Sequence, residues 1–570
     1  MRKVLCILIA LAFMGIAPAV AGDVPIQNLG PGDGLPQELL DALKGLNANQ
    51  QPVVVRGVVV PSKLFRTIED QRAWNRLGEI FANYAMFFHR NLTGTEMASR
   101  FEKALVALGP LKQVPLILKS RMPTRGPMSG FIVPDDVFAA KDDQEAWSRV
   151  TKLLYEYAYY ATNEWTGEEV AGQFITEGLT SLTPHDQAFT PKEARQFESM
   201  FIGFGGIGME IKKSEDPALP GIAGSPIPDS PSAKAGVQTG DVVVEICAKP
   251  VKEDAQTGTA KVDEAAPETC RSTANMPLEN AVELLRGPIN STVRVIVRRA
   301  GTTHPLPIVI TRDEIQMPLV KEAKLESGYG YIRLLAYGKT TVSGIIAAVQ
   351  KMKAENKGPL KGLLIDEKNN IGGDLEVVHA LLNTFLAASH YKDNESAVTI
   401  SEEHRGKIQA THSVRDPEIP GVDILNGAPL VVEVNAGSAS AAEIFAGVCQ
   451  IHGRCTVVGT EPSFGKGTVQ VMFPLQSGKV KITVAQYLIG PRGCEKPVQN
   501  IGIIPDILLK LDEKKKPETP PWHEKDYPNA LLTSTPSTAH CKYHFSVPAE
   551  HQKAAREMLK VFGLEPKDPT

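Results

Sequence analysis

The chain has 570 residues, of which 42% are hydrophobic and 22% are charged, and its formal net charge is −4. This length is too great for a single hydrophobic core, so we expect about two to four domains. The composition is that of a soluble globular protein, and the slightly negative charge favours neither nucleic acid nor an anionic membrane as a partner.

The N-terminus carries the pattern of a secretory signal peptide. Met1-Arg2-Lys3 is basic, residues 4–13 are apolar, and Ala19-Val20-Ala21 has the small-residue pattern of a cleavage site. The apolar run is too short to span a membrane, and no later run approaches the necessary length. We therefore predict a signal peptide over residues 1–21 and an exported protein. The periplasm is the expected location, with membrane association or full secretion as alternatives.

The rest of the chain falls into four segments. Residues 22–200 form a mostly helical N-terminal region by pattern, which begins with a loose leader and a short strand at 53–60. Residues 201–313 are rich in strands, with a polar insertion at about 249–275. Residues 314–510 alternate strands and helices, which indicates an α/β domain. Residues 511–570 have the composition of a linker followed by a tail with one short helix.

The cysteines predict disulfides. Removal of the signal peptide leaves an even number, which in an exported protein favours pairing. Sequence alone leaves about 15 connectivities open. Proximity favours Cys247–Cys270 and Cys449–Cys455, which leaves Cys494–Cys541 as the third pair. No zinc-binding spacing is present, so we expect no metal site.

Two glycine-rich stretches resemble cofactor motifs but lack their context. GFGGIG at 203–208 has the dinucleotide-binding spacing, yet a strand pattern follows it where a helix is required. GTEPSFGKGT at 459–468 has five residues between its first two glycines where a phosphate loop has four, and Gly467 follows the lysine. We therefore predict no nucleotide cofactor, and no other cofactor is expected.

The stretch NAGSASAAEI at 435–444 separates an apolar strand pattern from a helical one. Small residues here allow close packing of the helix on a sheet, or they expose a nucleophilic serine at a strand–helix corner. No G-x-S-x-G motif is present. Lys466 stands between Gly465 and Gly467 at the edge of a strand, a setting in which apolar surroundings can lower a lysine pKa. A Ser–Lys dyad is therefore a candidate.

Several segments in consistent order resemble the carboxyl-terminal processing peptidases of serine peptidase family S41. The resemblance covers roughly residues 166–510 and rests on NAGSASAAEIFAG, VVGTEPSFGKGTVQ and LLIDEKNNIGGDLE. FGGIGMEI, SAKAGVQTGDVVVEI and LENAVELLRG resemble the PDZ segments of that family. The resemblance implies an α/β fold: a ClpP/crotonase-like Ser–Lys protease core with an inserted β-rich PDZ domain and an α-helical N-terminal region.

The family pattern also assigns residues. Its nucleophile lies three residues before a glutamate, here Glu443, so the nucleophile maps to Ser440 and Ser438 is left with a structural role. The general base maps to Lys466. The supporting polar residue, four positions after the lysine, maps to Gln470.

Further positions follow from the same resemblance. Backbone amides of Gly372 and Ala441 map to the oxyanion hole, and the helix after Ser440 would favour a developing negative charge there. Gly206, Ile207 and Gly208 map to the loop that binds a peptide C-terminus. His185 and His452 were the other candidate side chains, and we assign both to structural roles.

The resemblance implies an ATP-independent serine endopeptidase that recognises protein C-termini through its PDZ domain and cleaves C-terminal or unfolded polypeptides. Expected partners are polypeptides with apolar C-termini, not nucleic acid; an adaptor protein and a homo-oligomer are left open. The alternative is a proteolytically inactive PDZ-containing peptide-binding adaptor. It is motivated by one inserted residue between Gly459 and Phe464 and by the altered stretch YLIGPRGCEKPVQ.

Overall fold

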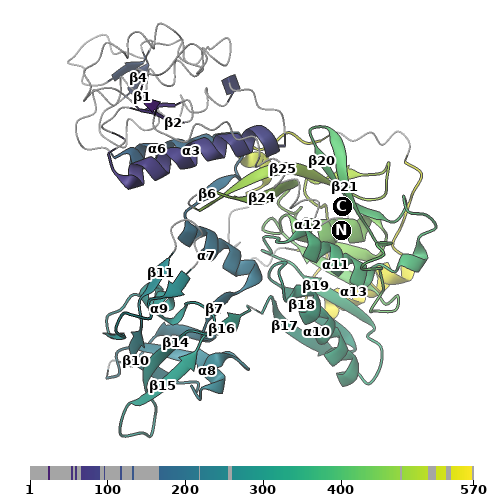
Figure 1. Cartoon of the computed structure of the whole chain (residues 1–570). Coiled ribbons are helices and arrows are strands. Elements are labelled where there is room, and N and C mark those ends of the chain that lie inside the picture. Colours follow the sequence, from purple (N-terminus) through teal and green to yellow (C-terminus); the bar gives the residue numbers. More distant parts are fainter. Residues whose placement is uncertain are drawn as a thin grey trace, which may run out of the picture. The chain divides into compact units, whose positions relative to one another are not determined.

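The computed structural model groups the chain into two units, Met1–Ala85 with Leu92–Ser181, and Met86–Asn91 with Leu182–Thr570 (Figure 1). The predicted signal peptide lies outside the residues that the structure describes. The described residues are 24–25, 53–55, 58–60, 64, 66–89, 95–96, 116–118, 131–133, 166–216, 218–253, 260–316, 318–475, 478–510, 522–534 and 541–567.

The first unit contains two long helices, α3 (Ile68–Phe87) and α6 (Gly167–Leu182). Trp74 and Phe174 from these helices contact each other, with ring centroids 6.3 Å apart. Strands β1 (Val24–Pro25), β2 (Val53–Val55) and β3 (Val58–Val60) form one small sheet, and β4 (Leu116–Leu118) pairs with β5 (Phe131–Val133). The single strand expected over 53–60 is wrong: β2 and β3 pair antiparallel. Arg56-Gly57 separates them in the sequence, and glycine in a two-residue connection is typical of a hairpin.

The β-rich part of the second unit is an antiparallel sheet with the strand order β15-β14-β10-β9-β8. Its strands are β8 (Met209–Lys213), β9 (Ile222–Pro226), β10 (Asp241–Ala248), β14 (Thr292–Arg298) and β15 (Leu306–Thr311), with β13 (Thr269–Ser272) added on β10. Helices α8 (Pro231–Lys234) and α9 (Leu278–Leu285) complete it. β7 (Phe204–Gly206) pairs with β16 (Asp313–Ile315), and β11 (Val251–Glu253) pairs with β12 (Ala260–Val262) in the predicted insertion.

The α/β core is built on a six-stranded sheet with the order β17-β18-β19-β22-β23-β27. The strands are β17 (Val320–Glu326), β18 (Tyr329–Leu334), β19 (Gly362–Asp366), β22 (Leu430–Val434), β23 (Cys455–Gly459) and β27 (Ile507–Leu508). All neighbours are parallel except β17 and β18. Parallel strands are usually covered on both faces, which explains the continuous apolar runs in the sequence.

The two faces of this sheet bury different side chains because residues alternate along a strand. Leu363 and Ile365 of β19 pack with the helices α10 (Thr341–Glu355), α11 (Leu375–Phe385) and α12 (Ala441–Ile451). Leu364, between them, packs on the other face with α13 (Ala549–Val561). The terminal helix therefore belongs to the core of the domain, although the sequence analysis placed it in a tail.

A second sheet carries the lysine region. Its order is β21-β20-β25-β24, with β6 and β26 also paired to β25. The strands are β6 (Gln187–Phe189), β20 (Val398–His404), β21 (Lys407–Ser413), β24 (Thr468–Pro474), β25 (Lys479–Ile489) and β26 (Lys496–Pro497). Helix α7 (Pro191–Ile202) follows β6. The pairing of β6 with β25 brings residues near 185 beside strands that lie about 300 positions later in the chain.

The structure confirms the α/β fold class and the three cysteine pairs. Cys247–Cys270, Cys449–Cys455 and Cys494–Cys541 are each joined. The third bond links the core to the segment that precedes α13. Among the described residues, no helix combines the length and the apolar character that a membrane crossing requires.

Candidate active site

Ser440 lies at the corner between β22 and α12, where it is the N-cap of the helix. Its backbone has φ 57° and ψ −116°, a conformation that a residue with a side chain rarely adopts. Its side chain is partly exposed, whereas Ser438 is fully buried and its hydroxyl donates to Glu367 O at 2.8 Å. Of the two serines in the stretch, Ser440 is therefore the one that a substrate can reach.

The buried carboxylate of Glu443 connects the serine corner to the lysine loop. Its Oε2 accepts from the backbone amides of Ser440 and Lys466, both at 2.9 Å. Its Oε1 accepts from the amide of Gly465 and the hydroxyl of Ser463, both at 2.6 Å. Burial raises the pKa of Glu443 to about 7, while these hydrogen bonds act in the opposite direction. Residues 440 and 466 thus have amides that converge on one oxygen atom.

Tyr487 of β25 also connects the serine corner to the lysine loop, through the backbone carbonyls of Ser440 and Lys466. Its buried hydroxyl lies within hydrogen-bond distance of both Ser440 O, at 3.2 Å, and Lys466 O. The one inserted residue between Gly459 and Phe464 therefore leaves the lysine loop attached to the serine corner at two points.

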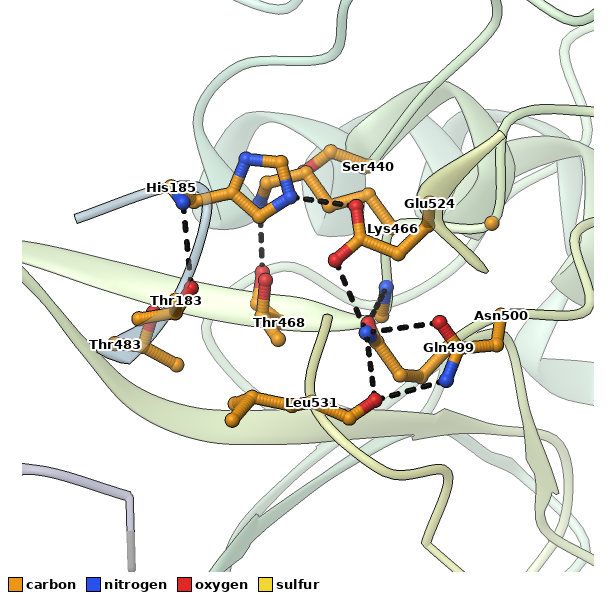
Figure 2. Close-up of polar contacts among 12 residues, drawn as sticks. Thr183, His185, Ser440, Lys466, Thr468, Thr483, Gln499, Asn500, Glu524 and Leu531 are labelled. Atoms are coloured by element: carbon orange, nitrogen blue, oxygen red, sulfur yellow. Dashed lines mark hydrogen bonds and ion pairs between the residues drawn. The ribbon is translucent and has the colours of Figure 1, made fainter. Parts of the chain in front are cut away.

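The ammonium of Lys466 is held by two acceptors on β24. Nζ donates to Gln470 Oε1 at 2.7 Å. It also donates to Thr468 O at 2.8 Å (Figure 2). Among the described residues, the acceptors of Nζ are these two oxygens and not the Ser440 hydroxyl. Catalytic hydrogen bonds often form only in the complex with substrate. Burial lowers the pKa of Lys466 to about 8, aided by the positive charge of Lys481.

Three carboxylates oppose this decrease in the pKa of Lys466. Glu524 has the largest effect of the three, followed by Glu443 and Asp186. A lysine with a pKa near 8 is neutral in a useful fraction of molecules at neutral pH, and the neutral form can accept a proton.

Gly372 approaches the serine corner closely. A methyl group added at Gly372 would lie 2.7 Å from Ser440 Cβ, 2.7 Å from Ala439 O and 2.8 Å from the amide nitrogen of Ala441. Ala441 supplies the first amide of α12, which has no acceptor within its own helix. The amide of Gly372 donates to Asn370 Oδ1 at 3.0 Å, so an oxyanion at this point would have to share or replace that acceptor.

Two further side chains lie at this site: Glu524, which no sequence pattern indicated, and His185, for which a structural role was expected. His185 Nε2 lies 2.6 Å from Glu524 Oε2, and Glu524 is fully buried (Figure 2). The backbone amide of Glu524 donates to Phe464 O at 2.9 Å, beside the lysine loop. Burial lowers the pKa of His185, and the nearby charge of Lys466 lowers it further. Residues 511–570 had the composition of a linker and a tail, so no local pattern pointed to Glu524.

Further contacts hold the segment of residues 522–534 on the core. Gln499 Nε2 donates to Glu524 Oε1 at 3.0 Å and to Leu531 O at 3.2 Å. Asn500 Nδ2 donates to the same carbonyl of Leu531 at 2.8 Å. Gln499 also accepts from the amide of Gly467 at 2.8 Å, so one glutamine links this segment to the lysine loop.

The three residues expected to bind a peptide C-terminus are the last residue of β7, Gly206, and the two residues that connect it to β8. Gly208 has φ 65°, a conformation that favours glycine, and Ile207 is buried. The carbonyl of Ile207 accepts from the amide of Ser232 at 2.8 Å, and that of Gly208 accepts from the hydroxyl of Ser232 at 2.7 Å. These carbonyls are thus fixed by the start of α8.

Comparison with known proteins identifies the family of this chain. Residues 328–509 match the sequence profile of Peptidase family S41. The chain is 32% identical over 348 residues to a "Carboxy-terminal-processing protease" of Bartonella bacilliformis, covering 59% of this chain and 69% of that protein. It is 26% identical over 386 residues to the "Carboxy-terminal processing protease CtpA" of Bacillus subtilis, covering 67% and 69%.

Among solved structures, the "Photosystem II D1 C-terminal processing protease" is similar at 20% identity, with a TM-score of 0.34 and coverage of 78% of this chain and 94% of that one. The sequence relatives carry the assignment. The chain belongs to the carboxy-terminal-processing proteases of peptidase family S41, and it is a serine-type peptidase.

Proposed function

We propose that this peptidase is exported, needs neither ATP nor a metal, and cleaves polypeptides with a dyad of Ser440 and Lys466. The observation that carries the proposal is the convergence of the Ser440 and Lys466 amides on a single oxygen of Glu443. The strained backbone of Ser440 at the start of α12 is a second support, because strain of this kind is frequent at active sites. The leader pattern and the three disulfides support export.

In the proposed mechanism, neutral Lys466 removes the proton from Ser440 Oγ while Oγ attacks the carbonyl carbon of the scissile peptide bond. The carbonyl oxygen becomes an oxyanion, which the amides of Ala441 and Gly372 would stabilise. Lys466 then gives the proton to the leaving amine, the C–N bond breaks, and an acyl-enzyme ester remains on Ser440. Water, deprotonated by Lys466, hydrolyses that ester, and the proton returns to Ser440.

We further assign residues 201–313 to the PDZ domain and residues 314–510 to the peptidase core. Gly206, Ile207 and Gly208 would bind the C-terminal carboxylate of a substrate through their amides. Support comes from β8, which follows this loop and is the last strand of its sheet among the described residues, so that an extended peptide could add to its outer edge. Substrates with apolar C-termini are expected. An adaptor protein and a homo-oligomer stay predictions.

The proposal predicts a definite pH dependence. Lys466 must be neutral to act as a base, so kcat/KM should rise with pH through about 8, the pKa to which burial lowers this lysine. Glu524→Gln removes a negative charge that favours the ammonium form, so the midpoint should move to lower pH. Lys481→Gln removes a positive charge that disfavours the ammonium form of Lys466, so the midpoint should move to higher pH. If the midpoints of both variants shifted in the same direction, the rise of kcat/KM with pH could not be assigned to Lys466.

The test of the function itself is a cleavage time course. The mature protein and its Ser440→Ala variant are incubated with an unfolded protein that ends in apolar residues, without ATP or added metal. Cleavage by the wild type and its loss in the variant, by about 10⁴-fold or more, is the expected result. An active Ser440→Ala variant would exclude this serine as the nucleophile. Tight binding of the tail without cleavage by either protein would favour the inactive adaptor.

A further inference from the structure

A chain of three hydrogen bonds connects Lys466 to a buried aspartate on a distant part of the sequence. Lys466 Nζ donates to Gln470 Oε1 at 2.7 Å, and Gln470 Nε2 donates to Thr483 Oγ1 at 3.0 Å. The Thr483 hydroxyl then donates to Asp186 Oδ1 at 2.7 Å. Thr483 is fully buried on β25, and Asp186 is 2% exposed. Neither Thr483 nor Asp186 was a candidate residue in the sequence.

The direction of each hydrogen bond follows from the charge at the far end. An ionised carboxylate can only accept, so the hydroxyl of Thr483 must use its single proton on Asp186. Towards Gln470 the hydroxyl can then only accept, so it selects the NH₂ end of the side-chain amide. Thr468 Oγ1 accepts from the same Nε2 at 2.8 Å, which uses the second N–H. The carbonyl end of Gln470 is left to face Lys466.

This orientation matters for the chemistry of a neutral lysine. A neutral amine has two N–H bonds and one lone pair. Gln470 Oε1 and Thr468 O accept from Nζ, so both N–H bonds of the neutral form have acceptors and the lone pair stays free for the proton of Ser440. If the Gln470 amide were reversed, its NH₂ would donate to Nζ and occupy that lone pair.

We propose that Asp186 and Thr483 are positioning residues that fix the orientation of the Gln470 amide and thereby keep the lone pair of Lys466 available to Ser440. The inference rests on the proposed Ser–Lys dyad and adds to it a requirement for two residues outside the dyad. Neither residue touches the substrate; each acts through Gln470. They come from separate parts of the chain, because Asp186 precedes β6 and Thr483 lies within β25.

A purely structural role must be distinguished from this one, since Asp186 Oδ1 also accepts from the backbone amide of Thr483 at 2.8 Å and so helps to join the two segments. Thr483→Val keeps that backbone bond and nearly the same side-chain shape, and it removes only the hydroxyl. Thr483→Ser keeps the hydroxyl and is the matched control. Gln470→Ala removes the group through which the threonine is proposed to act.

The experiment measures kcat and KM for the wild type, Thr483→Val, Thr483→Ser, Gln470→Ala and the double variant Gln470→Ala/Thr483→Val. We expect Thr483→Val to lower kcat about tenfold, the effect of one lost hydrogen bond, with KM nearly unchanged. Thr483→Ser should stay within about twofold of the wild type. In the Gln470→Ala background, Thr483→Val should have no further effect, because the group that it orients is already gone.

Three results would overturn the inference. The first is that Thr483→Val has the same kcat as the wild type while Ser440→Ala is inactive. The dyad would then stand, but Thr483 would not orient Gln470. The second is the same loss from Thr483→Val with and without Gln470, which would make its role structural. The third is a wild-type protein that cleaves nothing, which would overturn the dyad as well. If Thr483→Val fails to fold, Thr468→Val makes the same test at the other hydroxyl that accepts from Gln470.

Discussion

Replacement of Lys466 by methionine is expected to lower kcat/KM for polypeptide cleavage by about 10³-fold or more, since a general base contributes roughly 10² to 10⁴ and acts here as a unit with the nucleophile. Methionine keeps most of the side-chain volume and removes the amine. The measurement is a cleavage assay beside thermal unfolding at pH 7, so that loss of activity is separated from loss of fold.

The stability of Lys466→Met should be kept or increase, although its activity is lost. The pKa of Lys466 is lowered in the folded protein to about 8, so below that pH the protonated lysine favours the unfolded chain. Removal of the charge therefore removes a destabilising effect, although Gln470 Oε1 and Thr468 O lose a donor. We expect the unfolding midpoint at pH 7 to stay within a few degrees or to rise.

Lys481→Met is the matched control, because it removes another partly buried lysine amine, on β25, which pairs with the strand that follows Lys466. It should retain cleavage and shift the pH midpoint upward, as for Lys481→Gln. If Lys466→Met cleaved at more than about a tenth of the wild-type rate, Lys466 would not be the general base.

Gly372→Ala is the second substitution with a large expected effect. The new methyl group would lie 2.7 Å from Ser440 Cβ, and the backbone at Gly372 has φ 94°, where alanine is strained. The clash has to displace either the serine corner or the proposed oxyanion hole, so we expect kcat/KM to fall by at least about 10²-fold. Strain and clash together should lower the free energy of unfolding by about 2 kcal/mol.

Gly406→Ala separates the two causes. Gly406 has φ 76°, and a methyl group there would meet no atom within 4 Å. This control should lose about 1 kcal/mol of stability from backbone strain and keep its cleavage rate. If Gly372→Ala and Gly406→Ala cleaved equally fast, Gly372 would have no role at the serine corner. Both rates and both unfolding curves are measured on the same preparations.

The sequence determined the fold class and the peptidase family, and the spacing of the cysteines favoured the three pairs that the structure contains. These features leave local marks: continuous apolar runs for parallel strands, alternation of strands and helices, and short motifs such as NAGSASAAEI. It also distinguished the two serines of that motif. The buried Ser438 and the strained, partly exposed Ser440 agree with that distinction in the structure.

The tertiary structure alone decided which side chains surround Lys466. Asp186 follows Thr183-Pro184-His185 in the sequence and no pattern there assigned it a role, but the pairing of β6 with β25 brings it to Thr483. Glu524 stands in a segment with the composition of a linker, yet it is fully buried beside the lysine loop.

The physical reason is the difference between local and long-range interactions. Periodicity and turn chemistry act over a few residues and can be read in order along the chain. The pKa of a lysine and the direction of an amide depend instead on burial and on charges within a few ångströms, whatever their separation in sequence. Here those charges come from segments near residues 186, 443, 481 and 524. Only the folded chain brings them to one lysine.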